Sequence, residues 1–291
     1  MVTGAASGLG LAMCERFAAS GMDVVMADVE ETALRRAAER VESRGVKTLA
    51  VPTDVSDESA VQALASAATG HFGAVHLVCN NAGVSSDADP WFGPTSAWSW
   101  VMGVNFWGVV HGIRAFLPHL VAGGGGHIVN TASVAGILPG FGPAYDASKH
   151  AVVAVSEDLY NAMTVAGLPV GVSVLCPGWV RTSIIDAKRN WPRHLGEAPP
   201  PAPAAEVTRP HFRRAIDEGA TPAEVADRVA DAVAGERFWV FNESQFLEVA
   251  LGRWHSIAER QNPSVDRDLP GVTPTSEILA QVRSFLEQTQ A

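Results

Sequence analysis

Cysteines are scarce in this sequence and lie far apart. Its 291 residues include three, Cys14, Cys79 and Cys176, with neither a CxxC pair nor a histidine cluster beside them. Closely paired cysteines cross-link small secreted proteins, and regularly spaced Cys/His sets hold zinc. We therefore predict buried, reduced thiols and no bound metal.

Basic clusters and long apolar runs are missing too. The chain has 21 basic against 31 acidic residues, a formal net charge of −10, and no basic stripe of the kind that nucleic-acid binders carry. Apolar stretches such as residues 151–155 and 170–176 fall well short of the ~20 residues that span a membrane. The first residues lack the charged and then apolar pattern of a signal peptide. The sequence predicts a cytoplasmic protein without a nucleic-acid or membrane partner.

The sequence does contain a regular alternation of short β-branched runs with longer helical patterns. Strand patterns lie at residues 1–3, 23–27, 47–51, 75–80, 127–132, 171–176 and 237–241. Helical patterns between them lie at residues 9–20, 30–44, 58–72, 97–120 and 144–166. This rhythm predicts the α/β class: a Rossmann-type, doubly wound parallel sheet of about seven strands in a single domain. The first strand is short for a buried central strand, which leaves open whether the chain begins upstream.

The alternation stops after residue 176. Residues 178–211 read as irregular, with a proline-dense patch at residues 199–203, and we predict a substrate loop over about residues 178–215. Thr221, Pro222 and Glu224 then open a helix that runs to about residue 234. Residues 242–291 carry two further helical patterns, at 243–260 and 276–288, and are predicted as a helical extension packed on the domain formed by residues 1–241.

A glycine-rich loop joins the first strand to the first helix. Residues 3–10 read TGAASGLG, with Ser7 and Leu9 between the glycines at Gly4, Gly8 and Gly10. Glycines in this context let the backbone turn sharply and approach a pyrophosphate, which then lies on the helix N-terminus. The loop therefore predicts a dinucleotide site.

The acidic residue that follows the loop selects the cofactor. Asp28 ends the second strand, about twenty residues beyond the glycines, where its carboxylate accepts hydrogen bonds from ribose hydroxyls. A 2′-phosphate would bring negative charge against it, and no basic residue stands at Ser7 or Val29 to compensate. We predict NAD, with NADP less favoured.

A second set of residues carries proton chemistry. Tyr145 and Lys149 are four apart on a predicted helix, so their side chains share one face. A nearby ammonium is expected to lower the pKa of the phenol, so that Tyr145 exchanges a proton with a substrate oxygen. Ser133, at the end of the fifth strand, is placed to hydrogen-bond the same oxygen.

Taken together, these residues make the sequence resemble the classical short-chain dehydrogenase/reductase family. The matching pieces follow in family order over about residues 1–185: TGxxxGxG at 3–10, Asn80-Asn81-Ala82-Gly83, Asn105, Ser133, Tyr145-Asp146-Ala147-Ser148-Lys149 and Pro177-Gly178. The glycine spacing differs from that of extended members acting on nucleotide sugars. Bacterial enoyl reductases place the tyrosine and lysine further apart.

The resemblance implies further roles. Lys149 would also bind the nicotinamide ribose, and Asn105 would hold a water in a proton relay to Lys149, which makes Asn105, Ser133, Tyr145 and Lys149 the catalytic set. Asp54 and Val55 would contact the adenine. The remaining implied cofactor contacts are Asn81, Gly83, Pro177, Val180 and Thr182.

The predicted substrate pocket is aromatic and aliphatic. Its lining residues are expected to be Ser133, Val134, Leu138, Phe141, Tyr145 and Trp179, with Trp91, Phe92 and Trp191 as further candidates. Such a lining favours a hydrophobic secondary alcohol or ketone. Four basic residues, Arg181, Lys188, Arg189 and Arg193, leave a phosphorylated or carboxylated substrate open.

The favoured activity is hydride transfer between NAD and an alcohol or ketone carbon. Two alternatives remain: a catalytically silent NAD-binding sensor or scaffold, and an epimerase or dehydratase, for which no additional acid/base is identified. In the family the helices containing residues 105–119 and 145–166 pair across a two-fold axis, so we predict a homodimer or homotetramer.

Overall fold

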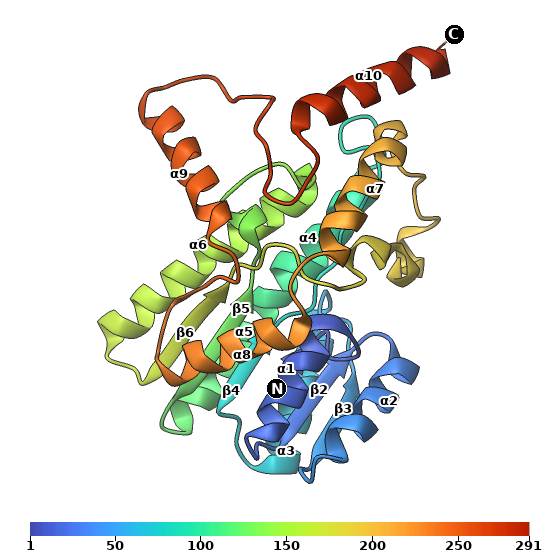
Figure 1. The fold of residues 1–291 in the computed structure, drawn as a ribbon. Coiled ribbons are helices and arrows are strands. Elements are labelled where there is room, and N and C mark those ends of the chain that lie inside the picture. The colour runs from blue at the N-terminus through green and yellow to red at the C-terminus, as the bar shows by residue number, and fades with distance from the viewer. Residues whose placement is uncertain (291) are drawn as a thin grey trace.

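The computed structural model describes residues 1–290 and is built on a parallel sheet of seven strands. Its strand order is β3-β2-β1-β4-β5-β6-β7, and every neighbouring pair is parallel (Figure 1). The strands are β1 (Val2–Thr3), β2 (Val24–Asp28), β3 (Thr48–Pro52), β4 (Leu77–Asn80), β5 (Gly126–Thr131), β6 (Val170–Leu175) and β7 (Trp239–Val240). The predicted Rossmann-type sheet is confirmed.

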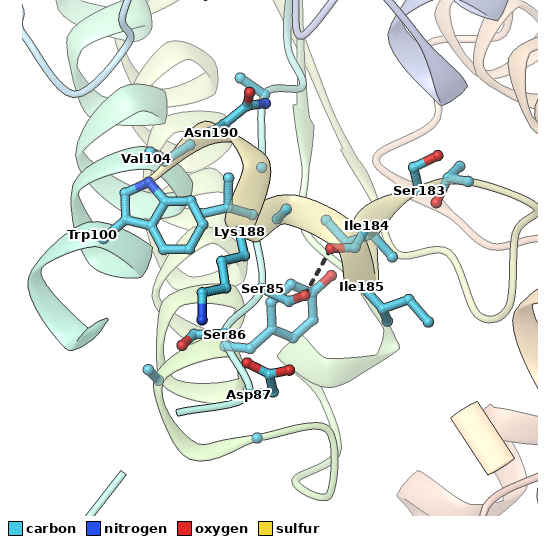
Figure 2. A pocket seen from close by; sticks show the side chains of 18 of the residues that line it. Ser85, Ser86, Asp87, Trp100, Val104, Ser183, Ile184, Ile185, Lys188 and Asn190 are labelled. Carbon is cyan, nitrogen blue, oxygen red and sulfur yellow. Dashed lines mark hydrogen bonds between the residues drawn. The ribbon is translucent and has the colours of Figure 1, made fainter. Parts of the chain in front are cut away.

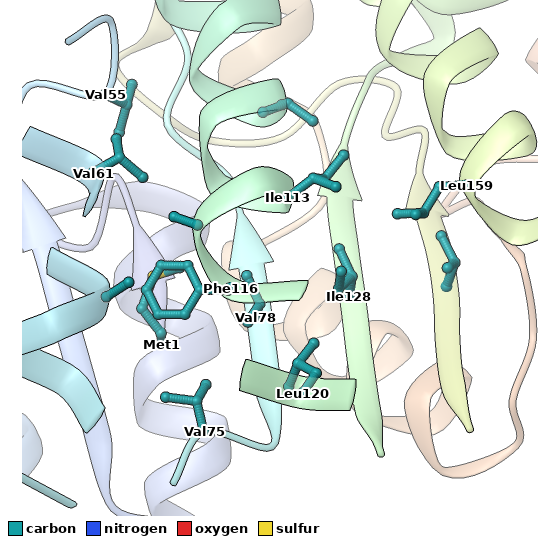
Figure 3. Packing of buried hydrophobic residues seen from close by; sticks show 14 of the residues in the cluster. Met1, Val55, Val61, Val75, Val78, Ile113, Phe116, Leu120, Ile128 and Leu159 are labelled. Atoms are coloured by element: carbon teal, nitrogen blue, oxygen red, sulfur yellow. The ribbon is translucent and has the colours of Figure 1, made fainter. Parts of the chain in front are cut away.

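Helices cover both faces of the sheet. One face packs on α1 (Gly8–Ala19), α2 (Glu31–Glu42) and α8 (Pro222–Ala234), and the other on α3 (Glu58–Phe72), α5 (Gly108–Ala122) and α6 (Pro143–Ala166). Figure 3 shows Phe116 and Leu120 of α5 over the strands β4 and β5. Sheet strands buried on both faces explain the near-continuous apolar runs in the sequence.

The strand order reverses between β1 and β4. In an open α/β sheet such a reversal leaves a crevice at the carboxyl ends of the strands, because the helices after the two strands go to opposite faces. The glycine loop follows β1, and residues 81–83 follow β4. Topology therefore brings these two loops to one edge of the sheet.

The single helix predicted over residues 97–120 is interrupted. It consists of α4 (Ser96–Met102), a π-helical turn η1 (Gly103–Trp107) and α5. A π turn admits one extra residue, which changes the direction in which the following side chains point. The interruption falls on Asn105, one of the predicted catalytic residues.

The irregular loop predicted over residues 178–215 is wrong in its second half. The segment contains the 3-10 turns η3 (Ile184–Asn190) and η4 (Arg193–Leu195), and then a helix, α7 (Pro203–Asp217). The last proline of the dense patch stands in the first turn of α7, where its fixed φ suits a helix and its missing N–H costs nothing. The proline density therefore marked a helix start as well as a loop.

The C-terminal residues form α9 (Gln245–Ala258) and α10 (Thr275–Gln290), close to the predicted helical patterns. Phe246 of α9 is fully buried against Trp179 and Phe141, and α10 lies against α7. In Figure 1 these helices lie on the same side of the molecule as α7, above the carboxyl edge of the sheet.

Three further features concern the cysteines, membrane-spanning helices and metal ligands of the described residues. Cys14, Cys79 and Cys176 are buried free thiols, as predicted, and burial raises the pKa of each. Within residues 1–290, no helix has both the length and the apolar content needed to cross a membrane. The same residues contain no group of His, Cys, Asp or Glu side chains arranged to hold a metal ion.

Candidate active site

A large cavity opens along the carboxyl edge of the sheet. Its volume is about 940 Å³, and it runs from the glycine loop, past Ser133 and Tyr145, to α7. Loops after β1, β2, β3, β4, β5 and β6 all contribute to its lining. One continuous cavity thus joins the predicted cofactor residues to the predicted catalytic residues.

The glycine loop has the geometry that its sequence predicts. Gly4 and Gly8 have φ values of +65° and +53°, in the left-handed region that favours glycine. A Cβ on Gly10 would lie 2.0 Å from the Gly4 carbonyl oxygen, so the first turn of α1 packs directly on the loop. Ser7 and Leu9 line the cavity with the glycines, at the N-terminus of α1. Partial positive charge at that terminus suits a pyrophosphate.

Asp28 is held in place by backbone donors. Its two carboxylate oxygens accept hydrogen bonds from the N–H groups of Ala6 and Glu30, at 3.0 and 2.9 Å, and the residue lines the cavity. Each oxygen keeps lone-pair capacity for a further donor. The aspartate is therefore oriented before any ribose arrives.

The other predicted cofactor residues also reach the cavity. Asp54 accepts hydrogen bonds from the N–H and hydroxyl of Ser56, at 2.9 and 2.6 Å, which fixes the turn after β3. Asn81 donates to the Thr3 carbonyl at 3.0 Å and accepts from the Thr131 hydroxyl at 3.2 Å, so it braces the loop between three strands. The cavity lining further includes Val55, Gly83, Pro177, Val180 and Thr182.

Tyr145 and Lys149 lie one turn apart at the start of α6. The ammonium of Lys149 is 5.6 Å from the centre of the Tyr145 ring and donates a 2.9 Å hydrogen bond to the Thr131 carbonyl. Ser133, just beyond β5, hydrogen-bonds the phenol. Its Oγ is fixed by the Ala135 N–H at 3.1 Å. All three side chains line the cavity, as the sequence predicts.

The protonation chemistry differs from the prediction. Burial raises the pKa of Tyr145 to about 12, against a smaller lowering by the Ser133 hydroxyl. Burial also lowers the pKa of Lys149 to about 8. The expected lowering of the phenol pKa by Lys149 is wrong, because burial of the phenol dominates its pKa and disfavours the phenolate. Tyr145 is thus a protonated acid at neutral pH here.

Asn105 is close to this group but does not line the cavity. Its side-chain oxygen accepts from the Val84 N–H at 2.8 Å, and its amide donates to the Val84 carbonyl at 3.0 Å and to the Ser148 hydroxyl at 3.1 Å. Ser148 in turn donates to the Tyr145 carbonyl at 2.7 Å. Asn105 therefore ties the loop after β4 to the helix that carries Tyr145, and its predicted part in a water relay stays a prediction.

The substrate wall matches the prediction in part. Val134, Phe141, Trp179 and Trp191 line the cavity. Leu138 does not: it is completely buried in the cluster that contains Trp179 and Phe246, beneath the lining. Its place after the 3-10 turn η2 (Val134–Gly136) turns it inward, so its assignment to the pocket is wrong.

Trp91 and Phe92 are also absent from the lining. They are 71% and 94% exposed, because both of their N–H groups bond to the Asp89 carboxylate in a turn that projects them outward. Trp98 and Trp100, from α4, take their place at the cavity. Residues 91–100 contain three tryptophans, and the sequence does not indicate which of them face the cavity.

Other lining residues escaped the sequence analysis. Phe212 reaches the cavity from α7, which was not predicted, and Ser85 and Ser86 reach it from the loop after β4. The indole of Trp179 donates to the Pro270 carbonyl at 2.6 Å, so the C-terminal extension supports the wall. No local pattern marks a contact between residues 91 positions apart.

Comparison with known proteins identifies the family. The family profile described as short chain dehydrogenase matches residues 1–193. A 1-deoxy-11-beta-hydroxypentalenate dehydrogenase of Streptomyces avermitilis is 36% identical over 284 residues, covering 93% of this chain and 97% of the relative. The CLA biosynthesis dehydrogenase/reductase of Lactiplantibacillus plantarum is 29% identical over 270 residues, covering 91% and 94%.

A solved structure agrees with these sequences. The short-chain dehydrogenase/reductase of Burkholderia phymatum in complex with NAD has a TM-score of 0.88 and 40% identity, covering 92% of this chain and 96% of that one. This chain is a short-chain dehydrogenase. It is therefore an oxidoreductase that acts on CH–OH groups of small molecules with a nicotinamide cofactor.

The residues present in this dehydrogenase fit such a cofactor. The oriented Asp28 carboxylate, the glycine cradle and the Tyr145–Lys149 pair line one cavity, which provides places for the adenosine ribose, the pyrophosphate and the reacting end of a dinucleotide. Positions 4, 8 and 10 admit no side chain without strain or collision.

Proposed function

We propose that this short-chain dehydrogenase interconverts a hydrophobic secondary alcohol and its ketone, with NAD as the preferred cofactor. The observation that carries the proposal is the continuity of the cavity, which joins the Asp28 site to Tyr145 and Ser133 and then to aromatic walls. A hydroxypentalenate dehydrogenase and a CLA biosynthesis dehydrogenase among the relatives support a hydrophobic substrate.

The residues supply positioning and proton transfer. A bound nicotinamide would supply the hydride chemistry, and the residues of the chain handle the proton on the substrate oxygen. Ser133 donates a hydrogen bond to that oxygen and Tyr145 takes or gives its proton, which Lys149, with a pKa lowered to about 8, passes toward solvent. In ketone reduction the protonated Tyr145 is ready to donate; in alcohol oxidation it must first lose its proton. Asn105 acts as a positioning residue through Ser148.

NAD is proposed over NADP because of charge. Asp28 and Glu30 both line the cavity at the adenosine end, and a 2′-phosphate would meet both carboxylates. Arg189 is nearby, but it pairs with Glu30 at 3.0 Å and is thereby neutralised. The NAD complex of the Burkholderia phymatum protein is consistent with this choice.

The proposal also covers the oligomeric state, the division of the chain and its location. Exposed apolar side chains such as Trp107 of η1 and Val165 of α6 support a homodimer or homotetramer. The division at residue 241 into a main domain and a helical extension, and the cytoplasmic location, also remain proposals.

The test is a replacement of the proposed acid/base. Purified wild type should reduce NAD with at least one member of a panel of aliphatic, aryl and steroid secondary alcohols. Tyr145→Phe should lower kcat by roughly 100-fold or more, the usual worth of a positioned acid/base, while the Kd for NADH, followed by fluorescence, stays within about twofold. Substantial turnover by Tyr145→Phe would refute the mechanism, and silence across the panel with intact NADH binding would favour the sensor alternative.

A further inference from the structure

The part of the cavity beyond Tyr145 is roofed by the segment that follows β6. Figure 2 shows Ile184 and Ile185 of η3 opposite Ser85 and Ser86, with Trp100 at the side. The Ser85 hydroxyl donates to the Ile184 carbonyl at 2.8 Å, which fastens the roof to the loop after β4. Trp100, Ile184 and Ile185 give this part of the cavity an apolar wall, against which a charged group on a substrate would need a specific partner.

Two arginines in the lining are already paired with carboxylates. Arg209 of α7 bonds to the Asp87 and Asp186 carboxylates, both at 2.8 Å, and Arg189 bonds to Glu30 at 3.0 Å. These pairs cancel the charges that would otherwise attract an anion. Arginines held by carboxylates therefore brace the roof and offer no net positive charge.

Lys188 differs from these arginines. Its ammonium donates to the Pro199 carbonyl at 3.0 Å, and no carboxylate among residues 1–290 lies within ion-pair distance of it. Figure 2 shows its side chain running past Trp100 toward Ser86. An ammonium has three N–H donors, and the Lys188 ammonium uses one of them in its hydrogen bond to the protein.

Ser86 completes the arrangement. Its oxygen accepts a hydrogen bond from the Ala88 N–H at 3.3 Å, which orients the side chain and leaves the hydroxyl proton for another acceptor. An ammonium and a hydroxyl directed into one apolar cavity match the two oxygens of a carboxylate. Asp87 is next in sequence, but its carboxylate is engaged by Arg209.

We propose that Lys188, assisted by Ser86, binds a carboxylate on the substrate, so that the substrate class is a hydrophobic hydroxy acid and the corresponding keto acid. This assignment rests on the proposed function, since Ser133 and Tyr145 must hold the reacting hydroxyl at the other end of the same cavity. A phosphate dianion would call for more donors than one ammonium and one hydroxyl provide.

The experiment compares an acid with its neutral counterpart. A long-chain (ω−1)-hydroxy acid and its methyl ester present the same secondary alcohol, and the ratio of their kcat/KM values isolates the effect of the carboxylate. Lys188→Met should lower the acid-to-ester ratio roughly 10- to 100-fold, the worth of one charge-assisted hydrogen bond. Lys188→Arg should retain most of the ratio, and Arg214→Met, which removes an α7 charge that is not part of the cavity lining, should retain it fully.

Binding without turnover gives a second readout. Trp100 and Trp191 line the cavity, so their fluorescence should report the unhydroxylated fatty acid more tightly bound than its methyl ester in wild type but not in Lys188→Met. Equal affinity for acid and ester in wild type would overturn the assignment, as would a ratio that Lys188→Met leaves unchanged or that Arg214→Met lowers equally. Oxidation of the ester with no preference for the acid would leave the proposed function standing and remove the substrate class alone.

Discussion

Tyr145 and Lys149 share one helical face, yet burial moves their pKa values in opposite directions from the usual 10.0 and 10.5, to about 12 and about 8. The cause is common to both: a dry site disfavours the phenolate and the ammonium alike. Sequence spacing placed the pair correctly, but their protonation states depend on how deeply α6 and the loop after β5 bury them.

A buried lysine makes stability depend on pH. Because the folded-state pKa of Lys149 is lower than its unfolded value, the unfolded chain binds more protons above about pH 8, and stability gained from this group rises with pH. Between pH 7 and pH 9.5 the free energy of unfolding of wild type should gain about 2 kcal/mol relative to Lys149→Met. Urea unfolding of the cofactor-free proteins at both pH values measures the difference; a gap that does not change with pH would contradict it.

The cofactor choice is also decided at single residues. Asp28→Ala combined with Val29→Arg should shift the ratio of NAD to NADP affinity toward NADP by roughly 100-fold or more. The double substitution removes a carboxylate that repels the 2′-phosphate and adds a guanidinium that binds it. Fluorescence titration with NADH and NADPH gives the ratio without turnover. Val29→Arg alone, which adds the cation and keeps the Asp28 carboxylate, is the matched control and should shift the ratio less; an unchanged preference in the double variant would remove the charge argument.

At the scale of elements, the substrate wall depends on segments far from it in sequence. Trp179 packs on Phe246 of α9 and donates to the Pro270 carbonyl in the connection to α10. Phe246 also fills the space beside Gly178, where a Cβ would come within 2.6 Å of its ring. The extension thus shapes the pocket even though it supplies no residue of the catalytic set.

Removing the Phe246 side chain should affect both stability and substrate binding. Phe246→Ala removes a fully buried ring and should cost about 3–5 kcal/mol of unfolding free energy. In the folded fraction, KM for a hydrophobic alcohol should rise more than kcat falls, because the Tyr145 geometry does not involve α9. Leu251→Ala, on the same helix but 60% exposed, should change stability by less than about 0.5 kcal/mol. Equal effects of the two substitutions would show that α9 is not a support for the pocket.

For the whole molecule, apolar side chains remain uncovered on the helical face formed by η1, α5 and α6. Trp107 is 50% exposed and Val165 is 89% exposed, on a surface away from the cavity lining. Large apolar groups left in water on paired helices are typical of a subunit interface.

Sedimentation velocity at micromolar concentration should therefore show a dimer or larger assembly. Trp107→Glu should shift the distribution toward the monomer, because a carboxylate would be buried at the contact. Leu251→Glu, on the exposed face of α9, is the control and should leave the distribution unchanged. A monomer at every concentration tested would rule out the proposed interface.

The sequence by itself determined the parts of this protein that are local. Strand–helix alternation determined the parallel sheet, the positions of the glycines determined the cradle, and a four-residue spacing placed Tyr145 and Lys149 on one face, because each depends on neighbours within a turn or a loop. Asp28 is also a local feature, because its place at the end of the second strand follows from the strand pattern itself.

Only the tertiary structure decided what depends on distant packing. It turned Leu138 inward and Trp100 toward the cavity, placed α7 where a loop was expected, and raised the pKa of Tyr145. It also neutralised Arg189 and Arg209 while leaving Lys188 without a carboxylate partner. Burial and charge pairing are sums over residues that are far apart in the chain, so no local pattern encodes them.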